Sequence, residues 1–507
     1  MKKRITCVIL VLILLFSLSP PVIAQETVPL ICLPGFASIP LVVNDGAEDE
    51  YTVFPPSMET AKAALGLLGG VQGNSANSII FGAINTLFNQ LQCDAEGIPM
   101  DESVGVKTFS KSLLHHNDEA ARYNYARAYG SLTGERVGWA NVYIFSFDWR
   151  LDTMEAGREL ATFIDMVKAE TGSDKVNIVA SSMGACVAYA YLAQNEQAAD
   201  SLNTLVIASS AIMGTTLLGD LFTGKFKVTA PGLENLVSSM SDSNVFLNFL
   251  SGLFTDTLVF AAKLFKLENS AVMTQLKKDF YAYTAIPIFG NFVGLWNLVP
   301  TEVLNEALAF MFPSGVNPVF EEKVRAYASI RDDAEEILSS LMDAGVKLAI
   351  VSNYDSQMIP VVESDYVLSD SVIDTRYTSF GATTANRNTV LPDSVSGSYV
   401  SPDRMIDAST SLFPEITWFI KGLGHNAPYV VGEEPVNLIM WLLESKTQQN
   451  VLSNASFTQF LSYNKATGSI SPVTESSSPS PFSSFSNLFS FIFSTLRNMV
   501  NRILKLY

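Results

Sequence analysis

Basic side chains are few in this sequence relative to acidic ones. The 507 residues include 32 Lys and Arg against 50 Asp and Glu, which gives a formal net charge of −18. Nucleic acids and anionic surfaces attract positive charge, so this balance argues against both as electrostatic partners of the protein. Hydrophobic residues, at 48% of the chain, are plentiful enough for a large core.

The apolar run near the N-terminus, residues 5–18, is too short to span a membrane comfortably. It follows Lys2, Lys3 and Arg4 and precedes the small-residue sequence Val22-Ile23-Ala24. This order is typical of a cleaved secretory signal. We therefore predict a signal peptide over residues 1–24 and a secreted protein, either extracellular or at the cell surface.

Cysteine is scarce, and its number is informative. Of four cysteines, Cys7 lies in the predicted signal peptide, which leaves Cys32, Cys93 and Cys186. An odd number excludes a fully paired disulfide framework. We expect Cys186 to be a buried thiol, and a single Cys32–Cys93 bridge stays open at this point.

Histidine occurs only three times. His115 and His116 lie in the polar stretch LLHHNDEA, which is typical of a surface segment, whereas His425 lies in the glycine-rich loop GLGH after an apolar segment. A general base with a pKa near neutrality is usually a histidine. Only these three histidines are therefore candidates for a catalytic base in this chain.

Residues 175–192, KVNIVASSMGACVAYAYL, combine a buried strand with a buried helix. Between them, Ala180-Ser181-Ser182-Met183-Gly184 has the small-x-Ser-x-small form of a nucleophile elbow, a sharp turn that exposes the serine above a parallel sheet. The helix N-terminus at this turn favours developing negative charge. The pattern predicts Ser182 as a nucleophile, although a strand–helix junction without catalysis fits the same five residues.

Strands and helices alternate through much of the chain, which predicts a doubly wound, mostly parallel α/β sheet. We expect the core to comprise residues 25–208 and 345–445. The expected strands cover residues 28–33, 141–147, 176–180, 204–208 and 347–353, and the expected helices cover 154–171, 183–192 and 435–443.

Residues 209–344 interrupt this alternation with a mostly helical pattern, which predicts an insertion. Its segment 281–301 has no charged residue, and its prolines and glycines exclude one regular helix. The insertion either forms a cap over Ser182 whose apolar side chains face an acyl chain, or has a core of its own. The cap interpretation places four side chains at the acyl pocket: Phe289, Phe292, Leu295 and Trp296.

The C-terminal part changes in composition. Residues 446–484 are expected to form a Ser- and Pro-rich linker. Residues 485–507 have an apolar helical face and the basic residues Arg497, Arg502 and Lys505. Such a segment lies in a membrane interface, docks on the core, or stays disordered.

An elbow serine requires a base and an acid, which follow it in the order acid, then histidine. His425 alone fits this order. Two aspartates compete as the acid. Asp355 directly follows the strand over residues 347–353, where many α/β hydrolases place it, while Asp370 comes after a further loop.

Four segments in order resemble the lecithin–cholesterol acyltransferase-like and bacterial lipase branch of the α/β hydrolases: LICLPGF from Leu30, FDWRL from Phe147, KVNIVASSMG from Lys175 and DSVIDTRYTSFG from Asp370. This sequence departs from the family pattern at Ala180, Ser181 and Ser371. The resemblance implies an α/β-hydrolase fold with a large helical cap, and it favours Asp370 as the acid. It further implies an oxyanion hole made by the backbone N–H groups of Phe36 and Met183. Asp148 and Arg150 are expected to form a structural ion pair around a buried Trp149.

We therefore expect a secreted serine carboxylic-ester hydrolase that acts on lipidic esters through an acyl-enzyme. Phospholipase or acyltransferase activity, or a non-catalytic protein that binds lipid or a cell surface, are the alternatives. The expected partners are a lipid or ester substrate and, through residues 485–507, a membrane surface. We expect no cofactor. Asp403 and Asp407 have a spacing that also suits a calcium ion, but a solvated loop fits it as well.

Overall fold

The computed structural model describes residues 27–56, 85, 88–116, 134–227, 270–359, 361–425 and 433–474. The predicted signal peptide over residues 1–24 and the amphipathic segment over residues 485–507 lie outside these ranges and stay predictions. In the part of the chain that the structure describes, no helix combines the length and apolar character needed to cross a membrane.

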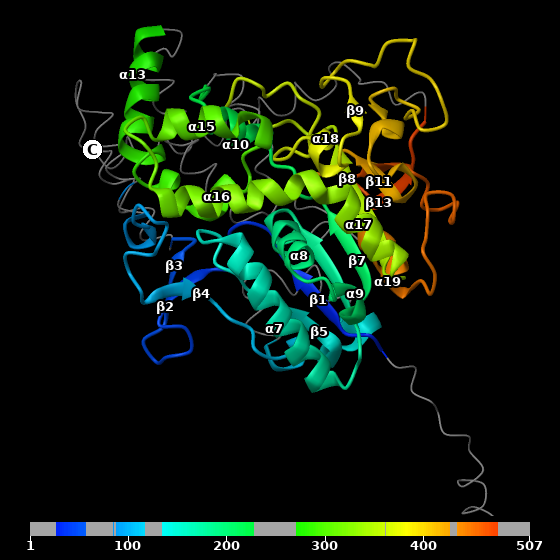
Figure 1. Cartoon of the computed structure of the whole chain (residues 1–507). Helices are drawn as coiled ribbons and strands as arrows, with labels where there is room; N and C mark the ends of the chain where they lie inside the picture. Colours follow the sequence, from blue (N-terminus) through cyan, green and yellow to red (C-terminus); the bar gives the residue numbers. More distant parts are fainter. Residues whose placement is uncertain are drawn as a thin grey trace, which may run out of the picture.

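An eight-stranded sheet forms the centre of the molecule (Figure 1). Its strand order is β13-β12-β11-β8-β7-β6-β1-β5, and all neighbours are parallel except β12 and β13. The inner strands are buried along most of their length, as their apolar sequences predict. The strands are β1 (Leu30–Leu33), β5 (Val142–Ile144), β6 (Val176–Ser181), β7 (Leu202–Ala208), β8 (Lys347–Tyr354), β11 (Thr417–Lys421), β12 (Phe460–Asn464) and β13 (Ser469–Pro472).

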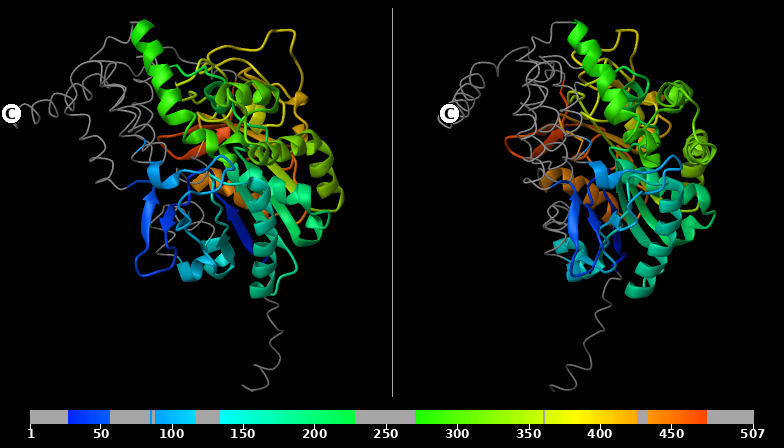
Figure 2. Two further views of the ribbon diagram at one scale, coloured as in Figure 1. Left: turned by 60° about the vertical axis from the view of Figure 1, so that its left-hand side comes forward. Right: turned by 90° about the vertical axis from the view of Figure 1, so that its left-hand side faces the viewer.

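Helices cover both faces of this sheet, which confirms the predicted α/β-hydrolase class. Helices α7 (Thr153–Thr171), α8 (Met183–Gln194) and α17 (Ala334–Asp343) lie on one face, and α19 (Glu433–Glu444) lies on the other (Figure 2). Helix α7 illustrates how the sequence sets the ends of a helix. The Asp152 carboxylate accepts a hydrogen bond from Met154 N–H at its start, and Gly172 ends it with a φ of 71°.

The insertion between β7 and β8 is helical, as predicted, and the uncharged segment 281–301 is broken into short pieces. Not all of the range 209–344 belongs to a cap, because α17 is the helix that leads directly into β8. The described elements are α10 (Thr216–Phe222), α13 (Ser270–Phe280), η5 (Tyr281–Ala285), η6 (Phe289–Asn291), α14 (Val293–Trp296), η7 (Thr301–Val303), α15 (Leu304–Met311), α16 (Pro318–Ile330) and η8 (Arg331–Asp333).

Smaller elements surround the core. A three-stranded antiparallel sheet, at the left of Figure 1, is formed by residues that lie between β1 and β5 in the sequence. Its strands are β2 (Leu41–Val43), β3 (Tyr51–Phe54) and β4 (Val104–Val106), and the other short elements are η2 (Asn89–Leu91), η3 (Gly134–Gly138), η4 (Trp139–Asn141), α9 (Ala198–Ser201), α18 (Thr375–Thr378), β9 (Thr383–Thr384), β10 (Ile406–Asp407), η9 (Ala408–Thr410) and η10 (Pro414–Ile416).

The prediction of a linker from residue 446 is wrong for β12 and β13. Strand β12 adds in parallel to the edge of β11, and β13 pairs with it in the antiparallel sense. The rings of Phe419 and Phe460 stack across this edge with centroids 5.4 Å apart. The hairpin itself is local, but β11, the strand that β12 joins, lies far away in sequence, so the local composition does not reveal that these residues extend the sheet.

The three cysteines outside the predicted signal peptide are buried free thiols, so the Cys32–Cys93 bridge does not form. Burial raises the pKa of the Cys186 thiol to about 11, which keeps it protonated and unreactive at neutral pH. The prediction of a buried thiol at Cys186 is confirmed.

Candidate active site

The turn from β6 to α8 has the strained backbone of a nucleophile elbow. Ser182 has a φ of 52° and a ψ of −124°, in a region that residues other than glycine rarely adopt. Its neighbours must be small: a Cβ on Gly184 would lie 2.3 Å from the Leu33 carbonyl oxygen, and one on Gly35 would lie 2.8 Å from the Ser182 Cβ. The strain holds the Ser182 side chain at the carboxyl end of the sheet.

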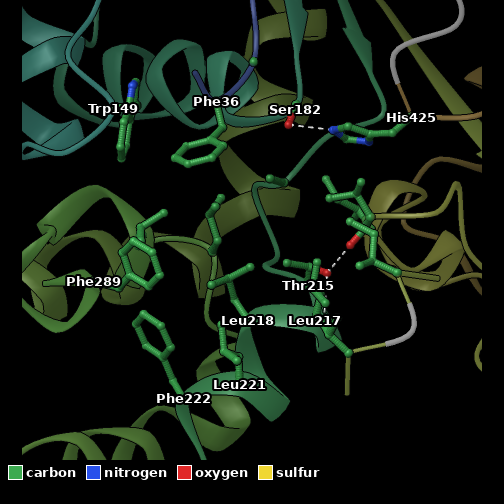
Figure 3. Close-up of a pocket in the computed structure, with 18 of the residues that line it drawn as sticks. Phe36, Trp149, Ser182, Thr215, Leu217, Leu218, Leu221, Phe222, Phe289 and His425 are labelled. Atoms are coloured by element: carbon green, nitrogen blue, oxygen red, sulfur yellow. Dashed lines mark hydrogen bonds between the residues drawn. The ribbon is translucent and has the colours of Figure 1, made fainter. Parts of the chain in front are cut away.

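Ser182, His425 and Asp370 form one series of hydrogen bonds. His425 Nε2 lies 2.8 Å from Ser182 Oγ, and His425 Nδ1 lies 2.7 Å from Asp370 Oδ2 (Figure 3). The Asp370 carboxylate is fully buried, and its Oδ1 accepts hydrogen bonds from Val372 N–H and Ile373 N–H. These backbone bonds fix the carboxylate, which in turn fixes the imidazole.

The three side chains come from the carboxyl ends of parallel strands, where ligand sites of α/β sheets lie. His425 follows β11, and Asp370 lies on a loop that leaves β8 and returns to it. That return is held by the hydrogen bond from Ser356 N–H to the Ser369 carbonyl oxygen, at 2.9 Å. Strand β8 itself holds the loop of the histidine, because the side-chain amide of Asn353 donates to the Gly424 carbonyl oxygen at 3.2 Å.

Asn353 is a residue that the sequence reasoning missed. Its amide also donates to Ser209 Oγ at 3.1 Å, so it links the ends of β7 and β8 to the loop before His425. Asn353 is a polar residue at the end of the apolar run LAIVSN, and this position at the carboxyl end of a strand is the sequence feature that could have indicated its role.

Asp355, the alternative acid, has other partners. Its carboxylate lies 3.6 Å from Lys421 Nζ, and the same ammonium group lies 2.9 Å from Asp403. Burial raises the pKa of Asp355. The structure therefore brings Asp370 to His425 and places Asp355 in an ion-pair cluster at the end of β11.

The two predicted oxyanion donors lie beside Ser182. Met183 is the first residue of α8, where N–H groups have no partner within the helix. Phe36 follows Gly35, where an added Cβ would lie 2.8 Å from the Ser182 Cβ. The Phe36 ring lines the pocket and meets Trp149 edge to face, with centroids 4.5 Å apart.

The structural ion pair in the Asp-Trp-Arg motif is confirmed. Arg150 is fully buried and binds both oxygens of Asp148, with a shortest N–O distance of 2.6 Å. It also donates to the carbonyl oxygens of Leu91 and Val104. Arg150 thus joins the small sheet to the core through the carbonyl oxygen of Val104. The side chain of Trp149, between the two paired residues, lines the pocket.

An apolar cavity of about 200 Å³ extends from Ser182 and His425. Figure 3 shows Phe36 and Trp149 on the side of the serine, with Leu218, Leu221 and Phe222 of α10 facing them across the cavity. Thr215 is a polar residue in this wall, and its hydroxyl donates to the Val372 carbonyl oxygen. The cavity therefore suits a hydrocarbon chain better than a polar group.

The residues that form this wall differ from those expected. Phe289 and Leu295 line the cavity, as predicted, but Phe292 and Trp296 do not. Trp296 is buried among the rings of Phe222, Phe312 and Phe320, so it belongs to the core of the insertion. Helix α10 supplies much of the wall instead, and its run TLLGDLF is a signal that the sequence reasoning did not use.

The aspartates considered for calcium have protein partners. Asp403 binds Lys421, Tyr354 and Ser401, while Asp407 accepts from the Ser409 N–H and hydroxyl. Among the residues that the structure describes, no three acidic, His or Cys side chains gather in a way that could hold a metal ion.

The family model of lecithin:cholesterol acyltransferase matches residues 134–258, which include the Asp-Trp-Arg motif and the elbow. No curated protein matches the chain. A solved structure, "The crystal structure of Tle4-Tli4 complex", aligns with 66% of this chain and 76% of that chain, at 10% identity and a TM-score of 0.31, a likeness too low to bear on function. The architecture and the matched segment together show that this chain has the α/β-hydrolase fold and is similar to the lecithin:cholesterol acyltransferase family over residues 134–258.

Proposed function

We propose that this protein is a serine carboxylic-ester hydrolase that acts on lipidic esters through an acyl-enzyme. The observation that carries the proposal is the series Ser182–His425–Asp370 at the mouth of an apolar cavity. The family similarity supports a lipid-acting acyl hydrolase or acyltransferase. A non-catalytic lipid-binding protein would have no need for this strained serine.

In the proposed reaction, Ser182 Oγ attacks the ester carbonyl carbon while His425 Nε2 takes the hydroxyl proton. The N–H groups of Phe36 and Met183 stabilise the negative charge on the carbonyl oxygen. His425 then returns the proton to the alcohol as the C–O bond breaks. Water then attacks the acyl carbon while His425 Nε2 takes its proton. His425 returns this proton to Ser182 Oγ as the bond between Ser182 Oγ and the acyl carbon breaks, and the carboxylic acid leaves. If an alcohol takes the place of water, the same steps give acyl transfer.

Labelling with a fluorophosphonate probe tests this proposal directly. Such a probe forms a covalent bond with an activated serine, so we expect one adduct, on Ser182, located by mass spectrometry of the digested protein. Absence of an adduct on the folded protein would contradict the serine mechanism.

We expect the substitution Leu218→Trp to shift the substrate preference toward short acyl chains. Leu218 faces the serine across the cavity and is only half-buried, so a larger side chain fills the cavity without overpacking the core. One methylene in such a pocket is worth ~1–3 kcal/mol, so the ratio of kcat/KM for octanoate over acetate esters should fall about tenfold or more.

The control for this prediction is Trp296→Ala, which removes a buried ring outside the cavity. It should cost about 3–5 kcal/mol of unfolding free energy and leave the chain-length preference unchanged. If instead Trp296→Ala changes the preference and Leu218→Trp does not, the assignment of the pocket wall is wrong.

We further propose that residues 485–507 bind a lipid surface. Their apolar face and basic residues suit the interface of a membrane or of aggregated substrate. Truncation after Ser480 should leave the hydrolysis of soluble short-chain esters unchanged and lower both vesicle co-sedimentation and activity on aggregated lipid. Equal vesicle binding with and without these residues would exclude the interfacial role.

A further inference from the structure

Asp374 lies between the loop that carries Asp370, residues 369–374, which we call the acid loop, and the part of the cavity wall formed by α10. It is the N-cap residue of α18, yet its carboxylate does not cap that helix. It extends to α10 instead, where Oδ2 accepts from Thr216 N–H at 2.8 Å and Oδ1 accepts from Thr216 Oγ1 at 2.6 Å. An aspartate at an N-cap ordinarily bonds to its own helix, so a tertiary contact has replaced the local one.

The residues around Asp374 connect this contact to the proposed catalytic acid. The loop over residues 369–374 is closed by the hydrogen bond from Asp370 N–H to the Ile373 carbonyl oxygen, at 3.1 Å. The N–H groups of Val372 and Ile373 hold Asp370 Oδ1. One short loop therefore orients the acid and ends at Asp374.

The same loop also holds the wall of the cavity. The Thr215 hydroxyl donates to the Val372 carbonyl oxygen at 2.5 Å, a bond visible in Figure 3, and accepts from Leu217 N–H at the start of α10. Val372 and Ile373 line the cavity together with residues of α10. Acid loop and α10 are thus joined through Thr215 and Thr216.

We propose that Asp374 is a positioning residue that couples the acyl-chain wall to the catalytic acid. The inference rests on the proposed function, because it assigns a role toward Asp370 and the acyl pocket. Asp374 is 1% exposed, and its nearest cation is Arg376, whose Nε lies 3.9 Å away at the protein surface. Its principal partners are therefore the two donors of Thr216.

Two effects should follow from Asp374→Ala. Loss of the anchor at the end of the acid loop should lower kcat for short soluble esters about tenfold, since small displacements of a catalytic group are costly. Loss of the anchor of α10 should lower kcat/KM for long-chain esters by about a further tenfold. Both are measured with acetate and octanoate esters.

Threonine variants separate this role from general stability. Thr216→Val removes the hydroxyl donor and retains the shape and the N–H group, so it should lower the octanoate-to-acetate ratio in the same direction by a smaller factor. Thr216→Ser retains the hydroxyl, so its kcat and its octanoate-to-acetate ratio should equal those of the wild type. These variants keep the inference testable if Asp374→Ala fails to fold.

Asp101→Ala is the matched control. Asp101 accepts from the N–H and hydroxyl of Ser103 at 3.1 and 2.6 Å, the same pair of donor types, in a surface turn beside β4. The substitution Asp101→Ala should therefore leave kcat and the octanoate-to-acetate ratio unchanged. If Asp374→Ala and Thr216→Val lower only the thermal midpoint, with both kinetic values at wild type, Asp374 is structural and the inference is wrong. A wild-type protein that does not react with the fluorophosphonate probe would instead contradict the proposed function itself.

Discussion

Ser182→Ala is expected to abolish ester hydrolysis, with a loss in kcat on the order of 10⁶-fold, because removal of a triad nucleophile leaves only the oxyanion donors and substrate binding. The substitution removes one oxygen from a side chain that is almost fully buried. The fold should therefore persist, as circular dichroism and the thermal midpoint would verify.

The adjacent serine offers a matched control for this prediction. Ser181 is the last residue of β6 and differs from Ser182 in backbone conformation, since only Ser182 of the two has a positive φ. Ser181→Ala should retain most of the activity and the fluorophosphonate adduct, whereas Ser182→Ala loses both. Activity of Ser182→Ala within tenfold of the wild type would eliminate the proposed mechanism.

Asp370→Asn is expected to lower kcat on the order of 10⁴-fold, because an amide in place of the carboxylate favours the wrong tautomer of the neighbouring imidazole. The carboxylate accepts from His425 Nδ1 and from two backbone N–H groups, which hold it in one orientation toward the imidazole. Steady-state hydrolysis of a soluble ester measures the effect.

Asp355→Asn is the comparison that decides between the two aspartates. Its partner is Lys421, and the loss of this ion pair should affect stability while kcat stays within about tenfold of the wild type. A large loss of kcat for Asp355→Asn with a small one for Asp370→Asn would show that the acid lies directly after β8 and that the family resemblance was misleading.

Local sequence patterns predicted the parts of the fold that depend on neighbouring residues. The elbow is one case, because the turn requires small residues on both sides of the serine, and a Cβ at Gly184 would collide with the backbone of Leu33 and Pro34. The parallel strands and α7, α8 and α19 are others, since burial on one face produces a periodic sequence and burial on all sides produces a continuous apolar run. The scarcity of histidine reduced the choice of a base to His425 before any geometry was available.

The choice between Asp355 and Asp370 depended on how a loop returns to the sheet. Sequence position placed Asp355 at the end of β8, but the pairing of Ser356 with Ser369 brings Asp370 back to the same edge. Asp355 instead forms an ion pair with Lys421, which lies at the end of β11. Neither contact produces a pattern in the local sequence.

By itself, the sequence determined the α/β class, the elbow and the order of the candidate residues, because each of these follows from residues a few positions apart. Only the tertiary structure decided that β12 and β13 extend the sheet, that α10 rather than Trp296 borders the cavity, and that Asp374 joins the acid loop to α10. These features arise from contacts between residues tens to hundreds of positions apart. Such contacts satisfy backbone and side-chain groups across the fold, and composition or periodicity cannot encode their partners.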